Sequence, residues 1–346
     1  MSTPTQDVVV EPDEFNDNDS TLGDPGQDGA ASTSSLNSSI LDYRKENGRT
    51  YHKYRDGKYH FPNDEEENER LGASLAKSQT IGYGRAWLTL AQDLQHHIFD
   101  LSFDGKLGLS PPNAPEAKAG RVLDLGTGTG IWAMDYGDDH PGAEVIGVDL
   151  SPIQPQLTTC SVPPNVRFEV DDIEDSWTYT RPFDYIHSRM MNTSICKWEE
   201  YLRQSYEHLN PGGWLELQEF NLPLSDDGTL TEDHALYQAM KYLGEAAAKT
   251  NRAFVDLDAL KPMMEATGFV DVAEIRFKWP SNTWPRNNKF KELGAWNHEN
   301  ITSGLQGFLM AALTRGLGWK ADEVNVLAAQ ARKDVGDRSI HAYWPM

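Results

Sequence analysis

Residues 122–132, VLDLGTGTGIW, place three alternating glycines directly behind an apolar run that carries one aspartate. Glycine weakens a strand and breaks a helix, so this much bare backbone needs a specific reason. At the carboxyl end of a strand, glycine lets main-chain N–H groups approach a ligand closely. The stretch therefore predicts a buried strand that leads into a ligand-binding loop.

Strand-like and helix-like segments alternate after this loop. Strands are predicted at 121–126, 143–151, 166–172, 183–189, 214–220 and 269–279. Helices are predicted at 130–140, 197–210, 231–250, 257–268 and over much of 286–335. This alternation is typical of an α/β fold with a mostly parallel sheet and right-handed crossovers.

The N-terminal part differs in composition from the rest. Residues 1–37 are acidic, rich in small polar residues and free of Lys and Arg, which predicts a disordered acidic tail. Residues 38–118 are predicted to form a cap region, with helices beginning in 64–71 and covering 93–103. Residues 119–346 form the predicted main domain.

The charge of the chain excludes some classes of partner. A net charge of −22 over 346 residues argues against a general nucleic-acid binder and against an anionic membrane surface. Cys160 and Cys196 lack metal-ligand spacing, and the N-terminus lacks the pattern of a secretory signal. We therefore predict an intracellular, cytoplasmic protein that binds no metal, nucleic acid or membrane.

The order of the acidic residues and glycines limits the class of ligand that this loop can bind. A dinucleotide fingerprint G-x-G-x-x-G that starts at Gly128 ends at Ala133, a permitted substitute, so a Rossmann oxidoreductase stays open. A P-loop fails because no Lys follows the glycines. Asp124, two residues before Gly126, suits a ligand with a cationic amino group, such as S-adenosylmethionine (SAM).

Two further strand ends carry acids. Asp149 ends the second predicted strand, where a carboxylate accepts hydrogen bonds from both ribose hydroxyls, a role shared with NAD sites. Asp171 and Asp172 end the third strand, and Asp172 is placed to meet an adenine amino group. The segment LNPGGWLEL then supplies a helix stop and a turn before the fifth strand.

In this order, the elements resemble class I SAM-dependent methyltransferases. The resemblance implies a Rossmann-like sheet, seven-stranded and mostly parallel, with helices on both faces and an N-terminal helical cap. Its last strand is antiparallel and lies next to the fifth. The resemblance also implies that SAM is bound by Asp124, Gly126, Thr127, Gly128, Gly130, Asp149, Leu150, Asp172 and Ile173.

Motifs along the chain narrow the resemblance further. YRDGKYHFPND, DLQHHIFDLSFDGKL, GVDLSPIQP, FDYIHSRMM, LNPGGWLELQE, LTRGLGW and HAYWP resemble the fungal LaeA-like methyltransferases. That family includes regulators of secondary metabolism and tailoring enzymes of biosynthetic clusters.

The sequence departs from the pattern of this family in two places. Residues 72–92 form an insertion, which is either a loop or a translated intron. Relatives also continue beyond HAYWP, so the last sheet strand is expected to lack most of its length.

Several polar residues are candidates for chemistry on the acceptor. His187, at the end of the fourth strand, is predicted to be a base or a group that positions the acceptor, with a backbone-bonded histidine as the alternative. Arg189 either clamps an acidic ligand group or pairs with a nearby acid. Gln218 and Glu219 either border the acceptor pocket or, as we favour, lie in a solvated loop.

The histidines of the cap and the tryptophans have plainer interpretations. His96 and His97 are predicted to be surface or packing residues. Trp132 either covers the donor or packs in the core. The C-terminal tryptophans either wall a planar substrate pocket or, as we favour, pack between helices; they are Trp279, Trp284, Trp296, Trp319 and Trp344.

Three functions follow, in order of preference. The first is a SAM-dependent methyltransferase that acts on a small molecule or peptide-derived product of fungal secondary metabolism. The second is a LaeA-like regulator that acts in the nucleus through protein partners. The third is a nucleotide-dependent oxidoreductase.

Overall fold

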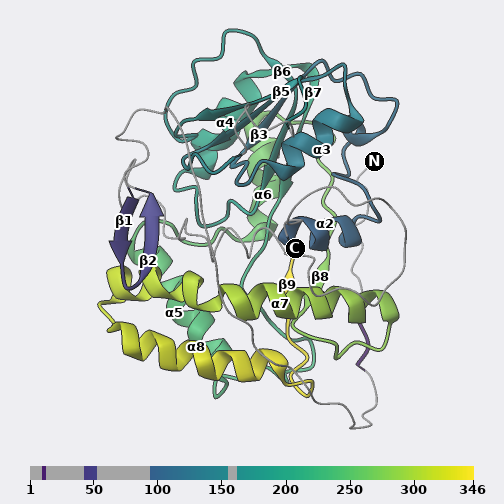
Figure 1. Ribbon diagram of the computed structural model, residues 1–346. Helices are drawn as coiled ribbons and strands as arrows, with labels where there is room; N and C mark the ends of the chain where they lie inside the picture. The colour runs from purple at the N-terminus through teal and green to yellow at the C-terminus, as the bar shows by residue number, and fades with distance from the viewer. Residues whose placement is uncertain (1–9, 13–42, 53–93, 155–161) are drawn as a thin grey trace.

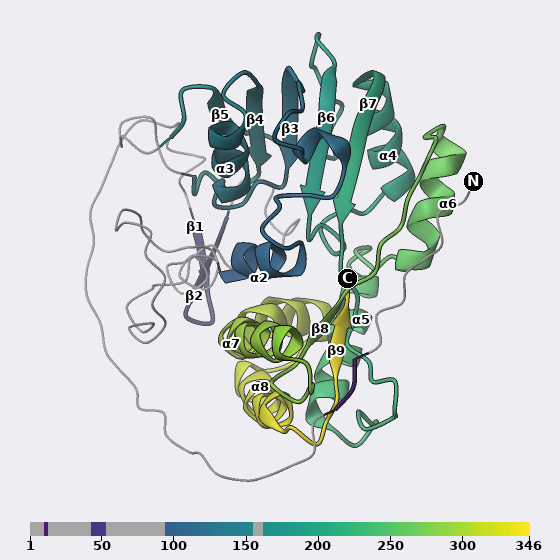
Figure 2. The same ribbon diagram turned by 90° about the vertical axis from the view of Figure 1, so that its right-hand side faces the viewer.

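The computed structural model describes residues 10–12, 43–52, 94–154 and 162–346. In this part of the chain, a sheet with its covering helices forms one half of the molecule and a group of helices forms the other (Figures 1 and 2). The predicted helix at 64–71 and the insertion at 72–92 lie outside the described residues, as does most of the predicted tail.

The first half is built on a five-stranded parallel sheet with the order β5-β4-β3-β6-β7. Its strands are β3 (Arg121–Leu125), β4 (Glu144–Asp149), β5 (Val166–Val170), β6 (Phe183–Arg189) and β7 (Leu209–Gln218). The chain moves outward from β3 to β5 and then returns to place β6 on the other side of β3. This reversal is a topological switch point, where α/β sheets bind ligands at the carboxyl ends of the strands.

Helices cover both faces of this sheet, so its central strands are buried. Helix α3 (Ile131–Asp139) packs on one face, while α4 (Trp198–Glu207) and α6 (Leu257–Thr267) belong to the cluster on the other. Every residue of β3 is buried. Burial on both faces explains why the predicted first strand reads as a nearly continuous apolar run.

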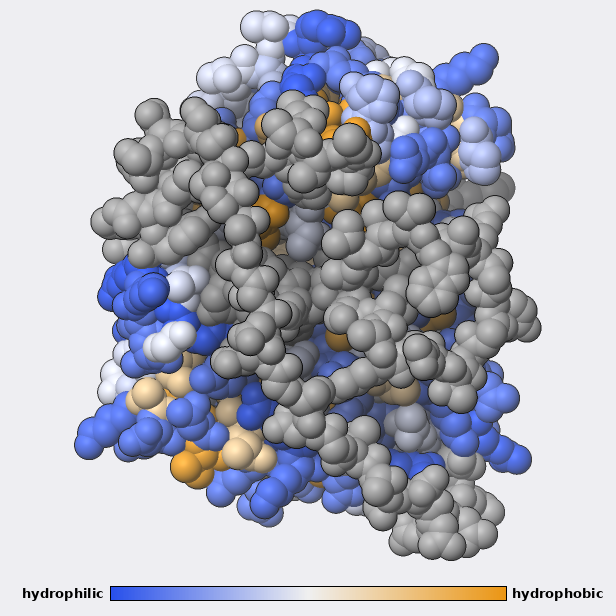
Figure 3. All heavy atoms as spheres, viewed as in Figure 1, coloured by the Kyte–Doolittle hydropathy of each residue, from blue (hydrophilic) through white to orange (hydrophobic). Residues whose placement is uncertain are grey.

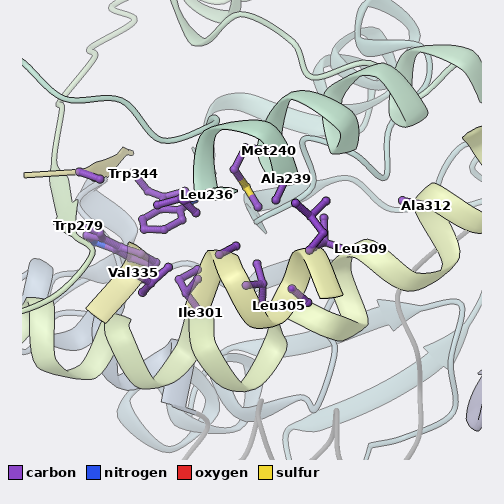
Figure 4. Packing of buried hydrophobic residues seen from close by; sticks show 14 of the residues in the cluster. Leu236, Ala239, Met240, Trp279, Ile301, Leu305, Leu309, Ala312, Val335 and Trp344 are labelled. Atoms are coloured by element: carbon purple, nitrogen blue, oxygen red, sulfur yellow. The ribbon is translucent and has the colours of Figure 1, made fainter. Parts of the chain in front are cut away.

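The second half is helical and shares one large apolar core. It contains α2 (Leu94–Ser102), α5 (Ala235–Lys249), α7 (Asn288–Ala311), a π-helical turn η3 (Ala312–Leu317) and α8 (Ala321–Gly336). Figure 4 shows Ile301 and Leu305 of α7 next to Val335, with Leu236 and Met240 of α5 across the core. Four of the C-terminal tryptophans lie in or against this core, and Trp284 is buried beside the last strand. The favoured interpretation, that these tryptophans pack between helices, is confirmed.

Two strands outside the main sheet correct the predicted topology. Strand β8 (Lys278–Pro280) pairs antiparallel with β9 (Tyr343–Pro345), and neither joins β7. The predicted strand at 269–279 is thus confined to its last residues, and Asp271 near its start has a left-handed φ of 55°. The central sheet of the described chain therefore has five strands instead of the expected seven, because HAYWP pairs with β8.

A β-hairpin corrects the expectation that the cap is helical. β1 (Tyr43–Glu46) and β2 (Arg49–His52) are joined by Asn47 and Gly48, which both have positive φ. Such a two-residue turn matches the twist of paired strands. Arg315 of η3 holds the hairpin through Glu46 at 2.7 Å. Helix α2 confirms the helix expected at 93–103.

Residues 10–12, which belong to the predicted tail, contact the helical half of the chain. Pro12 forms an isolated antiparallel bridge with Pro285, and the Arg286 N–H donates to the Glu11 carbonyl at 2.7 Å. These backbone bonds hold the short segment against the helical half.

No helix of the described chain is long and apolar enough to cross a membrane. On the face in Figure 3, the described surface is mostly hydrophilic.

Candidate active site

A cleft opens at the carboxyl ends of β3, β4 and β6, where the topology reverses. Figure 2 shows α2 lying below these strand ends, between the sheet and the helical half. The cleft is lined by Gln95, His96, Asp124, Gly126, Thr127, Gly128, Thr129, Ile131, Trp132, Asp149, Leu150, Asp171, Asp172, Ile173, Glu174, His187, Arg189, Met190, Met191, Ser194 and Arg252.

The glycine loop has the backbone conformation that its sequence predicts. Gly126, Gly128 and Gly130 have φ values of 70°, 55° and 83°, a region that favours glycine. A Cβ on Gly126 would lie 2.3 Å from the Met191 sulfur, and one on Gly130 would lie 2.5 Å from the Phe168 ring. A Cβ on Gly128 would meet nothing within 4 Å. Gly128 is thus the glycine whose main chain faces open space.

Asp149 ties the end of β4 to this loop. One carboxylate oxygen accepts from the Gly128 N–H at 2.9 Å, and the other accepts from the Ser151 N–H at 2.9 Å. Burial raises the pKa of Asp149, and the backbone hydrogen bonds offset part of that effect. The Leu150 N–H also donates to this carboxylate. A carboxylate has about four lone-pair sites, so it can still accept from a further donor, as ribose recognition requires. Gln154 completes the corner by donating to the Gly128 carbonyl at 2.6 Å.

A row of aligned residues crosses the five strands beneath the cleft. In register, the row runs Phe168, Gly147, Asp124, His187 and Glu216. A Cβ on Gly147 would lie 2.7 Å from both the Phe168 ring and the Thr127 hydroxyl. Glycine at 147 thus makes room for the loop side chain and for the aromatic ring beside it.

Asp124 and His187 form the polar centre of this row. Asp124 accepts from the Thr127 hydroxyl at 2.5 Å, and its other oxygen lies 2.7 Å from His187 Nδ1. The His187 ring is 1% exposed and stacks on Trp132 at 3.7 Å. Asp124 therefore shapes the glycine loop from inside the fold. Its predicted contact with a cationic amino group stays a prediction, and so does a direct action of His187 on an acceptor.

Trp132 packs in the core directly behind the wall of the cleft, which it also helps to line. Its side chain is 3% exposed, lies between His187 and Tyr136, and donates from Nε1 to the Leu107 carbonyl at 2.9 Å. The packing interpretation of Trp132 is confirmed.

Asp172 and Ile173 form the edge of the cleft that was expected to meet adenine. Asp172 is 3% exposed and accepts from the Glu174 N–H at 3.1 Å, which makes a tight turn after β5. Ile173 is 9% exposed and presents an apolar surface to the cleft. All the residues predicted to bind SAM line the cleft except Gly130, which is the N-cap of α3.

Arg189 connects the sheet to helix α2 on the other side of the cleft. It donates from Nε to Gln218 at 2.7 Å and from Nη2 to the Leu107 carbonyl at 3.3 Å, and its guanidinium lies 4.0 Å from the Phe99 ring centre. Arg189 Nη1 also lies 3.2 Å from His96 Nδ1. His96 reaches Asp135 of α3 at 3.0 Å through Nε2. His96 is thus part of the cleft wall, although the sequence predicts a surface or packing role.

A second arginine lies near the mouth of the cleft. Arg252 is 5% exposed, donates to the Ser194 carbonyl, and pairs with Glu174 at 3.5 Å. Four residues in or beside the cleft were not predicted from the sequence: Gln95, Gln154, Ser194 and Arg252. Gln95 and Gln154 stand inside the motifs DLQHH and GVDLSPIQP, which is the signal that points to them.

Gln218 and Glu219 are buried, so the favoured prediction of a solvated loop is wrong. Each residue is 6% exposed. Gln218 links Arg189 to Glu216, and Glu219 accepts from the Met191 N–H at 2.9 Å. Their burial follows from β7 continuing to Gln218 beside β6, which brings both residues under the cleft.

Comparison with known proteins gives the family of the chain. The family model described as a methyltransferase domain matches residues 94–274. The methyltransferase pytC of Aspergillus terreus is 39% identical over 320 residues, covering 92% of this chain and 90% of that protein. The secondary metabolism regulator LAE1 of Cochliobolus heterostrophus is 36% identical over 304 residues, covering 86% and 91%. The solved cyclopropane synthase MmaA2 of Mycobacterium tuberculosis is 16% identical, with a TM-score of 0.47 over 75% of this chain and 85% of that one.

The fold and the family match define a methyltransferase of the Rossmann-like α/β class, and the predicted SAM-dependent methyltransferase is confirmed at this level. Within that class, the chain belongs to the methyltransferase-domain family that includes the fungal pytC and LaeA-type proteins. This membership removes the oxidoreductase alternative.

Proposed function

We propose that this protein transfers a methyl group from SAM to a small molecule or peptide-derived product of fungal secondary metabolism. The observation that carries the proposal is the corner formed by Gly128 and Asp149. There, an open main chain and a carboxylate with spare lone pairs face the same cleft.

The residues of the cleft fit SAM in three places. Asp149 would accept from the ribose hydroxyls, Asp172 and Ile173 would meet the adenine, and the loop from Gly126 to Gly130 would pass beneath the amino-acid part. When bound, SAM supplies a methyl group on a cationic sulfur that is already activated for displacement. The protein then acts mainly by alignment, which contributes roughly 7–11 kcal/mol in well-oriented reactions.

The opposite wall of the cleft favours a small polar acceptor. Gln95 and His96 of α2 and Arg189 at the end of β6 line this part. Helix α2 lies close to the strand ends, so the acceptor would have to enter between the cap and the sheet. Such an enclosed arrangement suits a small molecule or the end of a peptide better than a folded protein surface.

A regulatory function is the second candidate, favoured by the similarity to LAE1 over most of both chains. In this case the fold would keep its donor site and act through protein partners in the nucleus, whereas the enzyme would act in the cytoplasm. Comparative metabolite profiling of a deletion strain separates the two. Accumulation of a product lighter by one methylene supports the enzyme, and broad loss of many metabolites supports the regulator.

Calorimetry tests the donor assignment directly. The purified chain should bind SAM and its demethylated product S-adenosylhomocysteine (SAH), and should not bind NAD. Binding of NAD without any response to SAM or SAH would contradict the proposal.

A further inference from the structure

Glu219 is a buried carboxyl group that the proposed function leaves unused. It follows the last residue of β7 and its Oε1 accepts from the Met191 N–H at 2.9 Å. The backbone N–H groups of Asn192 and Phe220 also donate to this carboxyl group. One side chain therefore joins the loop after β6 to the loop after β7.

The loop held by Glu219 forms part of the cleft. Met190 and Met191 line it, and the Met191 sulfur packs so closely on Gly126 that glycine is required there. Asn192 fixes the same loop from its other end, by donating to the Phe220 carbonyl at 2.6 Å and accepting from the Val255 N–H at 2.7 Å. Glu219 thus reaches the glycine loop through a single intermediate residue, Met191.

Glu219 is buried, and no cation is among its partners in the described chain. Its Oε2 is buried and has no hydrogen-bond partner in that part of the chain. Tyr201 of α4 lies close enough to interact electrostatically with Glu219 and with Asp124 of β3. Burial raises the pKa of Glu219 to about 8, and the backbone hydrogen bonds only partly offset it.

We propose that Glu219 is a positioning residue of the donor site, and that its bond to Met191 holds the loop after β6 against Gly126. This inference rests on the proposed function, because it assumes that the donor lies on the glycine loop. Ionisation of Glu219 would place a charge in a buried position near Tyr201, without a compensating cation among its partners in the described chain. The loop would then shift, and the donor site would lose the support of Met191.

The proposal predicts a specific pH dependence of donor binding. SAH affinity, measured by calorimetry on the full chain, should be constant near neutral pH and fall above pH 8. Once most of the protein carries ionised Glu219, the fall should level off near the loss of about tenfold that is expected when the bond to Met191 is removed. The variant Glu219→Gln keeps a neutral side chain that can still accept from Met191, so it should bind SAH normally and lack this alkaline decline.

Two further variants complete the test. Glu219→Ala removes the bond to Met191 and should weaken SAH binding at every pH, by about tenfold. Glu207→Gln changes an exposed carboxylate of α4 and should keep both the affinity and the alkaline decline of the unmodified protein. Circular dichroism should show that each variant is folded before its binding is measured.

The outcomes separate this inference from the proposed function. If SAH binds and Glu219→Gln shows the same alkaline decline as the unmodified chain, the positioning role is wrong while the donor site stands. If neither the unmodified chain nor Glu219→Gln binds SAH at any pH, the donor assignment fails and the inference fails with it.

Discussion

The two walls of the cleft are built in different ways. On the donor side, short continuous segments supply the site: the loop from Asp124 to Gly130, the corner from Asp149 to Gln154, and the turn at Asp172. On the acceptor side, the side chains come from α2 and from the end of β6, which lie far apart in the sequence. The donor wall is thus mainly a backbone shape, and the acceptor wall is a set of side chains assembled by the tertiary fold.

The largest effect is expected from a substitution in the donor wall of the cleft. Gly128→Val places a side chain in the open space above the loop, so SAH binding measured by calorimetry should fall by more than about 100-fold. Gly228→Val is the matched control, because Gly228 also has a left-handed φ, 73°, with nothing within 4 Å of its Cβ position. The control should carry a similar backbone strain and bind SAH normally. Normal binding by Gly128→Val would mean that the donor lies elsewhere.

This difference between the walls explains what could be predicted from the sequence. Alternating glycines behind a strand require an unusual backbone in almost any context, so the loop was predictable. An acid at the end of a parallel strand likewise lies at the sheet edge that binds ligands, which made Asp149 predictable.

The acceptor wall was less predictable because its contacts join distant segments. Arg189 bonds with Gln218 and lies against His96, and no local pattern identifies either partner. The alternating residues of 269–279 similarly indicate a strand without naming its partner, which proved to be β9. By contrast, Asn47–Gly48 is a known hairpin signal that the prediction of a helical cap overlooked.

A smaller effect is expected from Asp149. Asp149→Ala removes the carboxylate that faces the ribose position and also releases the Gly128 N–H, so SAH binding should weaken by about 1–3 kcal/mol. Asp139→Ala, an exposed residue at the end of α3, should leave the affinity unchanged. Equal affinities for the two variants would contradict the ribose assignment.

The raised pKa of Asp149 adds a prediction for acidic solution. Because burial raises this pKa, the folded protein protonates Asp149 at a higher pH than an ordinary aspartate. Donor binding uses the ionised carboxylate, so SAH affinity should fall as the pH decreases toward that raised pKa. Titration by calorimetry should show this acidic decline in the unmodified chain and its absence in Asp149→Asn. A decline of equal size in both proteins would assign it to another group.

A substitution of Arg189 tests whether the acceptor wall can be altered without loss of donor binding. Arg189→Met keeps apolar contact with Phe99 but loses the hydrogen bonds to Gln218 and Leu107, which should lower the free energy of unfolding by about 1–3 kcal/mol. Hydrogen exchange should increase in α2, while SAH affinity should stay within about twofold. Arg203→Met, which removes exposed ion pairs on α4, should leave the free energy of unfolding nearly unchanged. A large loss of SAH binding in Arg189→Met would show that the two walls are not separate.

The smallest effect is expected at Thr127. Its hydroxyl donates to Asp124 inside the fold, so Thr127→Val should cost about 1 kcal/mol of stability in a denaturant titration. SAH affinity should change by less than about threefold, because the hydroxyl is already engaged. A much larger loss of affinity would indicate that Thr127 turns toward the donor.

The central claim is that the open backbone at Gly128 and the carboxylate of Asp149 together hold the donor nucleoside. A crystal structure of the chain with SAH tests it most directly. We expect the ribose hydroxyls within hydrogen-bond distance of Asp149 and the adenine against Ile173. A nucleoside bound outside this corner, with Asp149 still bonded only to backbone N–H groups of the protein, would contradict the claim.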